Sequence, residues 1–562
     1  MRTRQLNNEG SLAVLAVAGT YVITLGMNLK ASLHSELLGF SIQRTDHNTN
    51  RTDWLTSFKV FEDVLPDKPV DRMVSTEQHP IQDFFWSDFT VRPGRSYTYR
   101  ILARGGTPAA LTTLAETSVT VTTETTDTGQ QHEVYFNRGV AGSQAFVNKF
   151  GDGPFSAIAT EHPEVWPWLS RGLQEAMFSF IQQATDAGFG IRASVYEFSY
   201  EPVLTELAKA RSRGADVQII VHAKADDSAE ASQLARMQAL VKQTGLENIT
   251  TFRKNQGDIS HNKFLILLKG TQPIAVWTGS TNLSVGGIFG HSNVGHIVRS
   301  QKVTQKYLSY WKSLHSDPVI KEARADTLQI TSDPVMGTLP AANSVDVFFS
   351  PRPHVTVLDW YANVVETQAK PSFITVPFGL DKRFEKILAE PQRTNLIFVI
   401  SDKPDVGLNT PEITANPANR TAFGSSITRP NSLESWMKKE RLTGLNSRVQ
   451  FIHTKYILVD PLGDDPITIT GSANFSVNSI QRNDENTLVI RGNTRVADVY
   501  FGEFMRLFRH FYFRDVENSV TTASDPARIF LNPTPIWAED FFTNGTYSEN
   551  VRLYFSGSTG DI

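Results

Sequence analysis

Two hydrophobic patterns divide this chain. Between residues 11 and 124, hydrophobic and polar positions alternate in short runs, as at 20–25, 97–102 and 118–122. Successive side chains of a strand point to opposite faces, so this period of two with frequent turns predicts a β-sandwich. Beyond residue 132, short apolar runs alternate with stretches of helical period, which predicts α/β architecture.

The α/β part contains an internal repeat of strands. The matching predicted strands are 134–137 with 347–350, 193–198 with 373–378, and 216–221 with 395–400. Predicted helices lie between them, including one near 168–184 and one after Glu201-Pro202. Each half ends in a helix with an aromatic stripe whose helical spacing assigns it to the core. Strands that alternate with helices predict a parallel sheet in each half.

These patterns predict a multidomain chain, with an N-terminal β-sandwich followed by two pseudo-symmetric α/β halves, each an α/β/α sandwich. The expected boundaries are 1–126 for the sandwich, 132–330 and 340–516 for the halves, and 517–562 for a C-terminal extension. The polar segment 122–131 is the expected linker. About 110 residues suit one sandwich, and about 390 suit two fused halves.

Charge and cysteine content exclude some chemistry. The 562 residues contain no cysteine, which excludes disulfides and thiol catalysis. The formal net charge of −4 gives no global basic field for nucleic acid. Local basic residues are expected on a solvated face; they are Arg253, Lys254, Lys438, Lys439, Arg441 and Arg448. The N-terminal apolar run 12–18 is interpreted as a strand and not as a signal peptide, so a cytoplasmic location is favoured and secretion stays open.

The repeat carries the same polar residues twice. His261-Asn262-Lys263 precedes Gly279-Ser280-Thr281-Asn282, and His453-Thr454-Lys455 precedes Gly471-Ser472-Ala473-Asn474. The offset from histidine to glycine is 18 residues in both copies, 261 to 279 and 453 to 471, and from histidine to asparagine it is 21. A structural repeat has no reason to keep a charged pair beside a buried strand, so the conserved spacing indicates a duplicated reactive site.

These residue types suit a phosphodiester. Its negative charge repels nucleophiles, so a catalyst must place donors around the phosphate before attack on phosphorus. Lysine supplies a point charge, and serine and asparagine add neutral donors. Histidine, with an ordinary pKa of about 6.5, can act as a nucleophile or as an acid near neutral pH. Two histidines therefore fit two roles.

Short hairpins are expected to hold each set together. The apolar runs 264–268 and 456–459 read as buried strands, and 274–278 and 467–470 as their return strands. The Gly-Ser and Asn of each copy follow the return strand directly. The glycine is expected to let the backbone approach a phosphate closely.

Together these motifs resemble the phospholipase D superfamily. The second half has the full pattern, His453-x-Lys455 with Asp460 five residues later, then Gly471 to Ser476 and the acidic Glu485. The first half departs from it at two places, with Leu268 at the aspartate position and Ser292, beside His291, at the expected place of the glutamate. The aspartate ends a strand in the family and is expected to be structural.

The resemblance implies a covalent phosphohistidine mechanism without a metal or other cofactor. The implied catalytic residues are His261, Lys263, Asn282, His453, Lys455, Asn474 and Glu485, and the implied phosphate-binding residues are Ser280 and Ser472. In the family the orienting group serves the histidine of the opposite half, which would pair Glu485 with His261. That pairing favours His261 as nucleophile and His453 as general acid.

The substrate stays open at this stage. Phospholipase D-type hydrolysis of a phospholipid, with transphosphatidylation as a further capability, is favoured over nuclease action on DNA or RNA. A third alternative is a non-catalytic binding module with a degenerate first half, because of Leu268 and Ser292. The segment around Pro93-Gly94 and Tyr97 resembles the turn and tyrosine corner of fibronectin type III domains. That domain is expected to bind a protein or a surface, in a monomeric enzyme.

Overall fold

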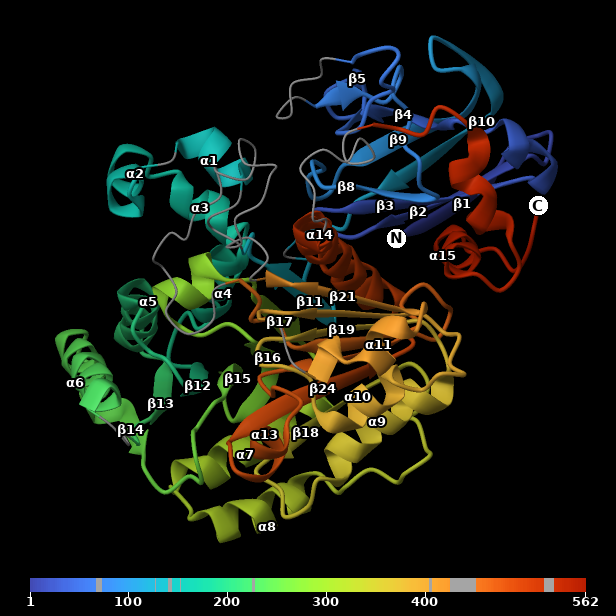
Figure 1. Ribbon diagram of the computed structural model, residues 1–562. Helices are drawn as coiled ribbons and strands as arrows, with labels where there is room; N and C mark the ends of the chain where they lie inside the picture. Colours follow the sequence, from blue (N-terminus) through green and yellow to red (C-terminus); the bar gives the residue numbers. More distant parts are fainter. Residues whose placement is uncertain are drawn as a thin grey trace.

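The computed structural model describes residues 1–66, 73–126, 128–139, 144–151, 153–224, 228–403, 407–424, 451–519 and 530–562. Within these ranges, two four-stranded sheets form the N-terminal region and two seven-stranded sheets form the rest, with one further two-stranded ladder. Figure 1 shows the N-terminal sheets stacked above the α/β part, with helix α14 (Thr494–Ser519) between them. The chain is therefore a multidomain protein that contains several sheets.

The N-terminal region has two antiparallel sheets. One has the order β1-β2-β3-β8, formed by Arg2–Leu6, Leu12–Ala18, Ile23–Leu29 and Phe85–Asp88. The other has the order β10-β9-β4-β5, formed by Ala110–Thr122, Ser96–Thr107, Gly39–Asp46 and Arg51–Trp54. The short ladder joins β6 (Thr56–Ser57) to β7 (Val74–Ser75), and η1 spans Ala31–Glu36. Side chains from both sheets share one hydrophobic core.

The first α/β sheet has the order β11-β17-β16-β15-β12-β13-β14. Its strands are His132–Phe136, Val294–Val298, Gln272–Gly279, Lys263–Lys269, Phe189–Val195, Asp216–His222 and Thr250–Arg253. The second sheet has the corresponding order β18-β24-β23-β22-β19-β20-β21. Its strands are Ser344–Ser350, Glu485–Arg491, Ile467–Gly471, Tyr456–Val459, Ser372–Val376, Ile397–Ser401 and Asn419–Phe423. The predicted repeat of strands is thus present in the topology.

Neither large sheet is wholly parallel, so that part of the prediction was wrong. Strands β12, β13 and β14 pair in parallel, but β12 pairs antiparallel with β15, and β15, β16 and β17 continue antiparallel. The second sheet follows the same pattern. The physical reason is the hairpin that carries each motif, because two strands joined by a short turn must run in opposite directions.

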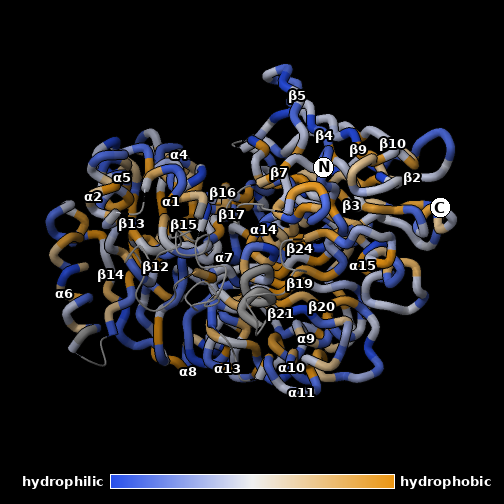
Figure 2. Tube along the Cα trace, turned by 45° about the horizontal axis from the view of Figure 1, so that its top comes forward, coloured by the Kyte–Doolittle hydropathy of each residue, from blue (hydrophilic) through white to orange (hydrophobic). Residues whose placement is uncertain are grey.

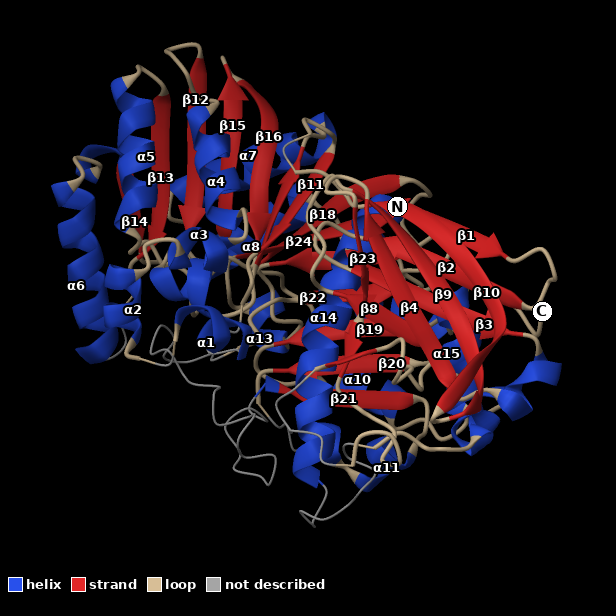
Figure 3. Cartoon of the chain, turned by 90° about the horizontal axis from the view of Figure 1, so that it is seen from above, coloured by secondary structure: helices blue, strands red, loops and turns tan. Residues whose placement is uncertain are grey.

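Helices cover both faces of the sheets, as Figure 3 shows for the first one. The helices of the first half are α1 (Gln144–Phe150), α2 (Phe155–Glu161), α3 (Val165–Ser170), α4 (Leu173–Gln182), α5 (Glu201–Ser212), α6 (Ser228–Gln243) and α7 (Gln301–His315). Those after it are α8 (Ile320–Ile330), α9 (Thr356–Gln368), α10 (Lys382–Leu388), α11 (Pro411–Ala415), α13 (Val477–Gln481) and α14. Short turns of helix are η2 (Glu247–Ile249), η3 (Gly286–Gly290) and η4 (Gly407–Asn409). The helix predicted near 168–184 is two helices, because Arg171 and Gly172 both have a positive φ.

One core joins the two halves. It contains Phe264 from β15 and Phe373 from β19, together with the aromatic stripes of α7 and α14. The predicted assignment of both stripes to the core is confirmed, since Tyr307, Phe501 and Phe504 are fully buried. Figure 2 shows hydrophobic positions gathered along the central strands, including β19 and β24. Burial of this shared face fixes the two sheets relative to each other.

The C-terminal extension packs on the N-terminal sheets, which places both chain ends beside them (Figure 3). It contains η7 (Pro535–Phe542) and α15 (Tyr547–Ser556). The Trp537 Nε1–H donates to Leu37 O at 2.9 Å, and Phe84 packs against the Trp537 ring. At Gly26 a Cβ atom would lie 1.9 Å from the Phe555 carbonyl oxygen, so only glycine allows α15 to approach β3 so closely.

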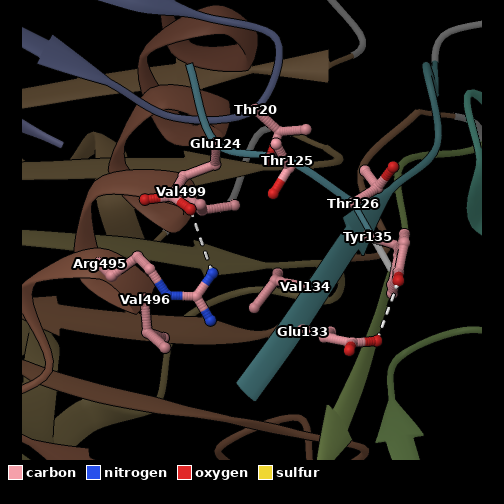
Figure 4. Close-up of a pocket in the computed structure, with 10 residues that line it drawn as sticks. All are labelled: Thr20, Glu124, Thr125, Thr126, Glu133, Val134, Tyr135, Arg495, Val496 and Val499. Atoms are coloured by element: carbon pink, nitrogen blue, oxygen red, sulfur yellow. Dashed lines mark hydrogen bonds and ion pairs between the residues drawn. The ribbon is translucent and has the colours of Figure 1, made fainter. Parts of the chain in front are cut away.

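The N-terminal region also contacts the second half. The Arg2 guanidinium donates to Asp498 Oδ1 of α14 at 2.7 Å, and the N-terminal ammonium lies 3.1 Å from Asp498 Oδ2. A small pocket lies where the regions meet, lined by Glu124, Glu133 and Arg495 among others (Figure 4). None of its lining residues belongs to the two motifs. No described helix is long and apolar enough to cross a membrane.

Candidate active site

The two motifs occupy matching places in the two sheets. Lys263 begins β15 and Lys455 directly precedes β22, while Gly279 and Gly471 end the return strands β16 and β23. Hydrophobic runs form these strands, and their burial brings each polar motif to the same edge of its sheet. The predicted hairpins are confirmed by antiparallel pairing of β15 with β16 and of β22 with β23.

Backbone hydrogen bonds join each motif to the opposite half. The His261 N–H donates to Asp484 O at 3.0 Å, and the Asp484 N–H donates to Ile259 O at 3.0 Å. In the mirrored arrangement, the Ser292 N–H donates to Phe451 O at 2.8 Å, and the His453 N–H donates to Ser292 O at 3.2 Å. Each histidine is therefore held by the segment that precedes the last strand of the other half.

The histidine side chains also form hydrogen bonds to the opposite half. His261 Nδ1 lies 2.8 Å from Glu485 Oε1 and 3.0 Å from Oε2, and His453 Nδ1 lies 2.9 Å from Asn293 Oδ1. Pairing of His261 with Glu485 was expected, but Ser292 was the wrong counterpart of Glu485. Asn293 lies 14 residues after Gly279, as Glu485 lies 14 residues after Gly471. That equal offset was the sequence signal that could have identified Asn293.

Hydrogen bonds fix the orientation of the Asn293 amide. Its Nδ2 donates to Gly287 O at 2.6 Å and to His291 Nδ1 at 2.8 Å, while its Oδ1 accepts from Ser280 Oγ at 2.7 Å. A carbonyl oxygen can only accept, so His453 must carry a proton on Nδ1. The Nε2 atom of neutral His453 then holds the lone pair and is the atom able to exchange a proton with a substrate.

Ser280 and Ser472 form hydrogen bonds that hold the strands of Asn293 and Glu485, the residues that orient the two histidines. Besides the bond to Asn293, Ser280 Oγ accepts from the Val294 N–H at 3.1 Å, and Ser472 Oγ accepts from the Asn486 N–H at 3.0 Å. The single hydroxyl hydrogen of Ser280 is therefore used inside the protein. These contacts do not support the prediction that Ser280 binds the phosphate directly.

Gly279 and Gly471 are not explained by the expected close approach of the backbone to a phosphate. A Cβ atom at Gly279 would lie 2.2 Å from Val294 O, and one at Gly471 would lie 2.1 Å from Asn486 O. The close approach is thus between neighbouring strands. It lets the serine after each glycine reach the adjacent strand and hold the orienting residue.

Two amides have unused hydrogen-bonding capacity. The Oδ1 atoms of Asn282 and Asn474 are buried and have no hydrogen-bond partner within the described part of the chain. They occupy equal positions, three residues after Gly279 and Gly471. A buried polar atom without a partner is costly, so a ligand that meets these amides would relieve that cost.

Both motif lysines are buried. Lys263 Nζ donates to His261 O at 2.5 Å, and Lys455 Nζ donates to His453 O at 2.8 Å. Burial lowers the pKa of Lys263 to about 7, against the opposing effects of Glu485 and Glu197. Burial also lowers the pKa of Lys455 well below its usual value, and the charge of Lys263 adds to this effect. An anion between the lysines would reverse both shifts.

The other titratable groups respond to the same burial. Burial and then the Lys263 ammonium lower the pKa of His261, and burial and then Lys455 lower that of His453. Burial raises the pKa of the Glu485 carboxyl to about 8, while Lys263 acts to lower it. The site is therefore short of negative charge and suits an anionic substrate.

Four further residues around the motifs were not identified from the sequence. The Tyr196 ring lies 5.0 Å from the His261 ring, and the His222 Nδ1 accepts from the Ser260 N–H at 3.2 Å. The His291 ring lies 4.5 Å from the His453 ring, and Glu197 acts on the pKa of both lysines. His222 ends strand β13, the other three lie in loops, and no spacing rule marks any of the four.

Asp460 lies away from the histidines. It follows β22 at the end opposite Lys455, where its backbone N–H donates to Pro371 O at 2.8 Å. Leu268 takes the corresponding place in β15 and is 4% exposed within the shared core. An apolar residue is therefore accepted at this position of the first half, which agrees with a structural role for Asp460 in the second.

The basic residues before the motifs behave differently from one another. Arg253 is fully buried, and its Nε donates to Asp484 Oδ2 at 2.7 Å, so the expected solvated position was wrong for this residue. The Asp484 carboxylate is itself fully buried, which explains why a buried cation is needed there. Lys254 is exposed. The other basic residues, Lys438, Lys439, Arg441 and Arg448, lie outside the described residues.

Comparison with protein families agrees with this geometry. A family model described as the PLD-like domain of cardiolipin synthase matches residues 178–315 and 399–508, one segment in each half. The predicted resemblance to the phospholipase D superfamily is thereby confirmed for these two segments. A search of curated proteins finds no significant match.

Solved structures that match part of this chain include a phosphatidylserine synthase from Haemophilus influenzae, with 11% identity and a TM-score of 0.41 over 60% of this chain and 85% of that one. The yeast tyrosyl-DNA phosphodiesterase has 13% identity and a TM-score of 0.30 over 57% and 88%. The Nuc protein of Salmonella typhimurium has 21% identity and a TM-score of 0.20 over 25% and 84%. These low scores leave the reaction to be inferred from the site itself.

Proposed function

We propose that this protein is a phosphodiesterase of phospholipase D type that acts through a covalent phosphohistidine. The observation that carries the proposal is the reciprocal pairing of His261 with Glu485 and of His453 with Asn293 across the two halves. Each pairing leaves one Nε2 atom for chemistry, and a carboxyl group stands behind only one histidine. Glu485 makes His261 the more basic ring, so His261 is the proposed nucleophile.

The steps follow from these assignments. His261 Nε2 donates its lone pair to phosphorus while the P–O bond to the leaving alcohol breaks. Protonated His453 gives the proton on its Nε2 to that oxygen, because the anionic substrate offsets the burial that lowers its pKa. Water then loses a proton to His453 and attacks phosphorus, and the P–N bond to His261 breaks. Lys263 and Lys455, with Asn282 and Asn474, are proposed to hold the phosphate oxygens.

A phospholipid ester is the favoured substrate, and transfer of the phosphatidyl group to an alcohol would use the same intermediate. The net charge of −4 and the Glu197 carboxylate near the lysines disfavour a polyanion such as DNA or RNA. The alternative of a non-catalytic module rested on Leu268 and Ser292. Leu268 is an apolar residue in the core, and Asn293 supplies an orienting amide in the first half.

The finer description of the architecture is also proposed. The two N-terminal sheets and the Tyr97 hydroxyl, which accepts from the Arg92 N–H at 3.0 Å, support a fibronectin type III-like sandwich. The equal strand orders support two pseudo-symmetric halves. We place the enzyme in the cytoplasm as a monomer whose N-terminal domain binds a protein or a surface, which size-exclusion chromatography with light scattering and cell fractionation would test.

The decisive assay is direct. Purified protein is incubated with labelled phosphatidylcholine or labelled single-stranded DNA, each with EDTA. Release of the lipid headgroup by the native protein, and its loss in His261→Ala and His453→Ala variants that keep their circular dichroism spectra, would support the proposal. Cleavage of DNA alone would favour the nuclease alternative, and inactivity on both would favour a binding module.

A further inference from the structure

His291 is a buried histidine beside the candidate active site that the duplicated motifs do not include. Its side chain is 8% exposed, and its ring lies 4.5 Å from the His453 ring with an angle of 36° between the planes. Both rings contact the same amide, since His453 Nδ1 lies 2.9 Å from Asn293 Oδ1 and His291 Nδ1 lies 2.8 Å from Asn293 Nδ2. The two imidazoles therefore lie side by side.

The contact with Asn293 decides where the proton of His291 lies. An amide nitrogen can only donate, so His291 Nδ1 must accept this hydrogen bond and carries no proton. Burial, followed by the charge of Lys455, lowers the pKa of His291 to about 3. The ring is therefore neutral near pH 7, and its single N–H proton is on Nε2.

The Nε2–H donor of His291 is not used inside the protein. Within the described part of the chain, the His291 ring forms a hydrogen bond through Nδ1 and none through Nε2. A buried donor without an acceptor is costly, so a ligand oxygen that meets this N–H would be bound favourably. The unpartnered amide oxygens of Asn282 and Asn474 indicate in the same way that the site is built around a ligand.

The equivalent residue of the second half makes a different contact. Asn483 lies two residues before Glu485, as His291 lies two residues before Asn293. Its Nδ2 donates to Glu485 Oε1 at 3.3 Å, so it gives a proton to the orienting residue, whereas His291 accepts one. An imidazole at this place therefore supports the orienting amide through one nitrogen and keeps a proton on the other.

The backbone around His291 is held on both sides. The His291 N–H donates to Gly286 O at 3.2 Å, and the His291 carbonyl accepts from Asn137 Nδ2 at 2.8 Å. Gly139 packs so closely on the next residue that a Cβ atom there would lie 2.6 Å from Ser292 Cα. A donor that is fixed before the substrate arrives needs no reorganisation during the reaction.

We propose that His291 is a further catalytic residue, a neutral donor whose Nε2–H binds a non-bridging oxygen of the phosphate. The proposal rests on the phosphodiesterase function and adds a third histidine to its site. Lys455, which is proposed to hold the same phosphate, lies close enough to His291 to act on its pKa. The Nε2–H therefore belongs to the His453 side of the phosphate, where it stabilises the charge that the oxygens gain in the transition state.

Two substitutions separate the two nitrogens of His291. In His291→Asn the amide oxygen can take the place of Nδ1 and accept from Asn293, but the N–H at the place of Nε2 is lost. In His291→Gln the longer amide can put an N–H near the place of Nε2, but the acceptor for Asn293 is lost. A direct donor predicts that glutamine preserves function better than asparagine, and a role confined to holding Asn293 predicts the reverse.

The first measurement does not depend on turnover and is calorimetric titration with inorganic phosphate. We expect His291→Asn to bind phosphate about tenfold more weakly than the wild type, the size of one hydrogen bond to a charged group, and His291→Gln to retain most of the affinity. The matched control is His132→Asn, which removes a buried imidazole from β11 of the same sheet and should bind phosphate as the wild type does. Unchanged affinity in His291→Asn, a greater loss in His291→Gln, or no phosphate binding by the wild type would overturn the donor assignment.

The second measurement is hydrolysis of p-nitrophenyl phosphocholine, a chromogenic phosphodiester, by the same variants. We expect kcat/KM to fall about 100-fold in His291→Asn, the usual loss when one donor to a developing negative charge is removed, and to fall less in His291→Gln. The opposite order of the two variants would assign His291 to the support of Asn293 alone. Failure of the wild type to hydrolyse the ester would count against the proposed function, and the phosphate titration would still decide the role of His291.

Discussion

The asymmetry between Glu485 and Asn293 leads to a test of which histidine attacks. Glu485→Gln keeps the shape of the side chain but replaces a charge-assisted hydrogen bond to His261, at 2.8 Å, with a neutral one. A hydrogen bond to a charged group contributes about 1.5–3 kcal/mol and a neutral one about 0.5–1.5 kcal/mol. The difference of about 1–1.5 kcal/mol slows adduct formation about 5- to 13-fold, since about 1.4 kcal/mol is tenfold. Glu485 is 1% exposed, so water cannot compensate.

The assay is acid quenching during turnover of p-nitrophenyl phosphocholine, followed by mapping of phosphate on peptides. We expect the adduct on the peptide that contains His261, and less of it in Glu485→Gln. Asn293→Ala is the matched comparison, because it removes the partner of His453 instead. It should slow water attack and raise the adduct level, since p-nitrophenolate leaves without an acid. Phosphate on the His453 peptide, or the opposite response of the two variants, would refute the assignment.

Three further outcomes are expected. His261→Ala and His453→Ala should each abolish turnover while circular dichroism stays native; a near-wild-type rate in either would contradict the shared site. The profile of kcat/KM against pH should be bell-shaped. On the acidic side, Glu485 loses its charge as pH falls through its raised pKa of about 8. On the alkaline side, Lys263 loses its charge as pH rises through its lowered pKa of about 7. Glu485→Gln should remove the acidic limb, and an unchanged profile would dismiss this origin. Arg253→Met should lower the free energy of unfolding in urea by about 3–5 kcal/mol, because Asp484 would stay buried without its cation; a loss under about 1 kcal/mol would show that the pair is dispensable.

The fold could be predicted where hydrophobic period and local turns decide it. The apolar runs of β15 and β22 can be buried only as strands of a sheet. The aromatic stripes of α7 and α14 can be buried together only on one face of a helix. The parallel sheet was overpredicted, since alternating strands and helices do not reveal that hairpins add antiparallel strands to the same sheet. The split between α3 and α4 depends on two backbone conformations that period does not show.

The sequence by itself determined the two motifs, because equal spacing in two copies is a property of the chain alone. It also held the offset that points to Asn293, although only the hydrogen bond to His453 gives that offset a meaning. The tertiary structure decided which groups act together. Glu485 lies 224 residues from His261, and only the shared core and the backbone bonds between the halves bring them to 2.8 Å. The burial of Arg253 and of the lysines was decided in the same way, because the cost of burying a charge depends on partners that lie far away in the sequence.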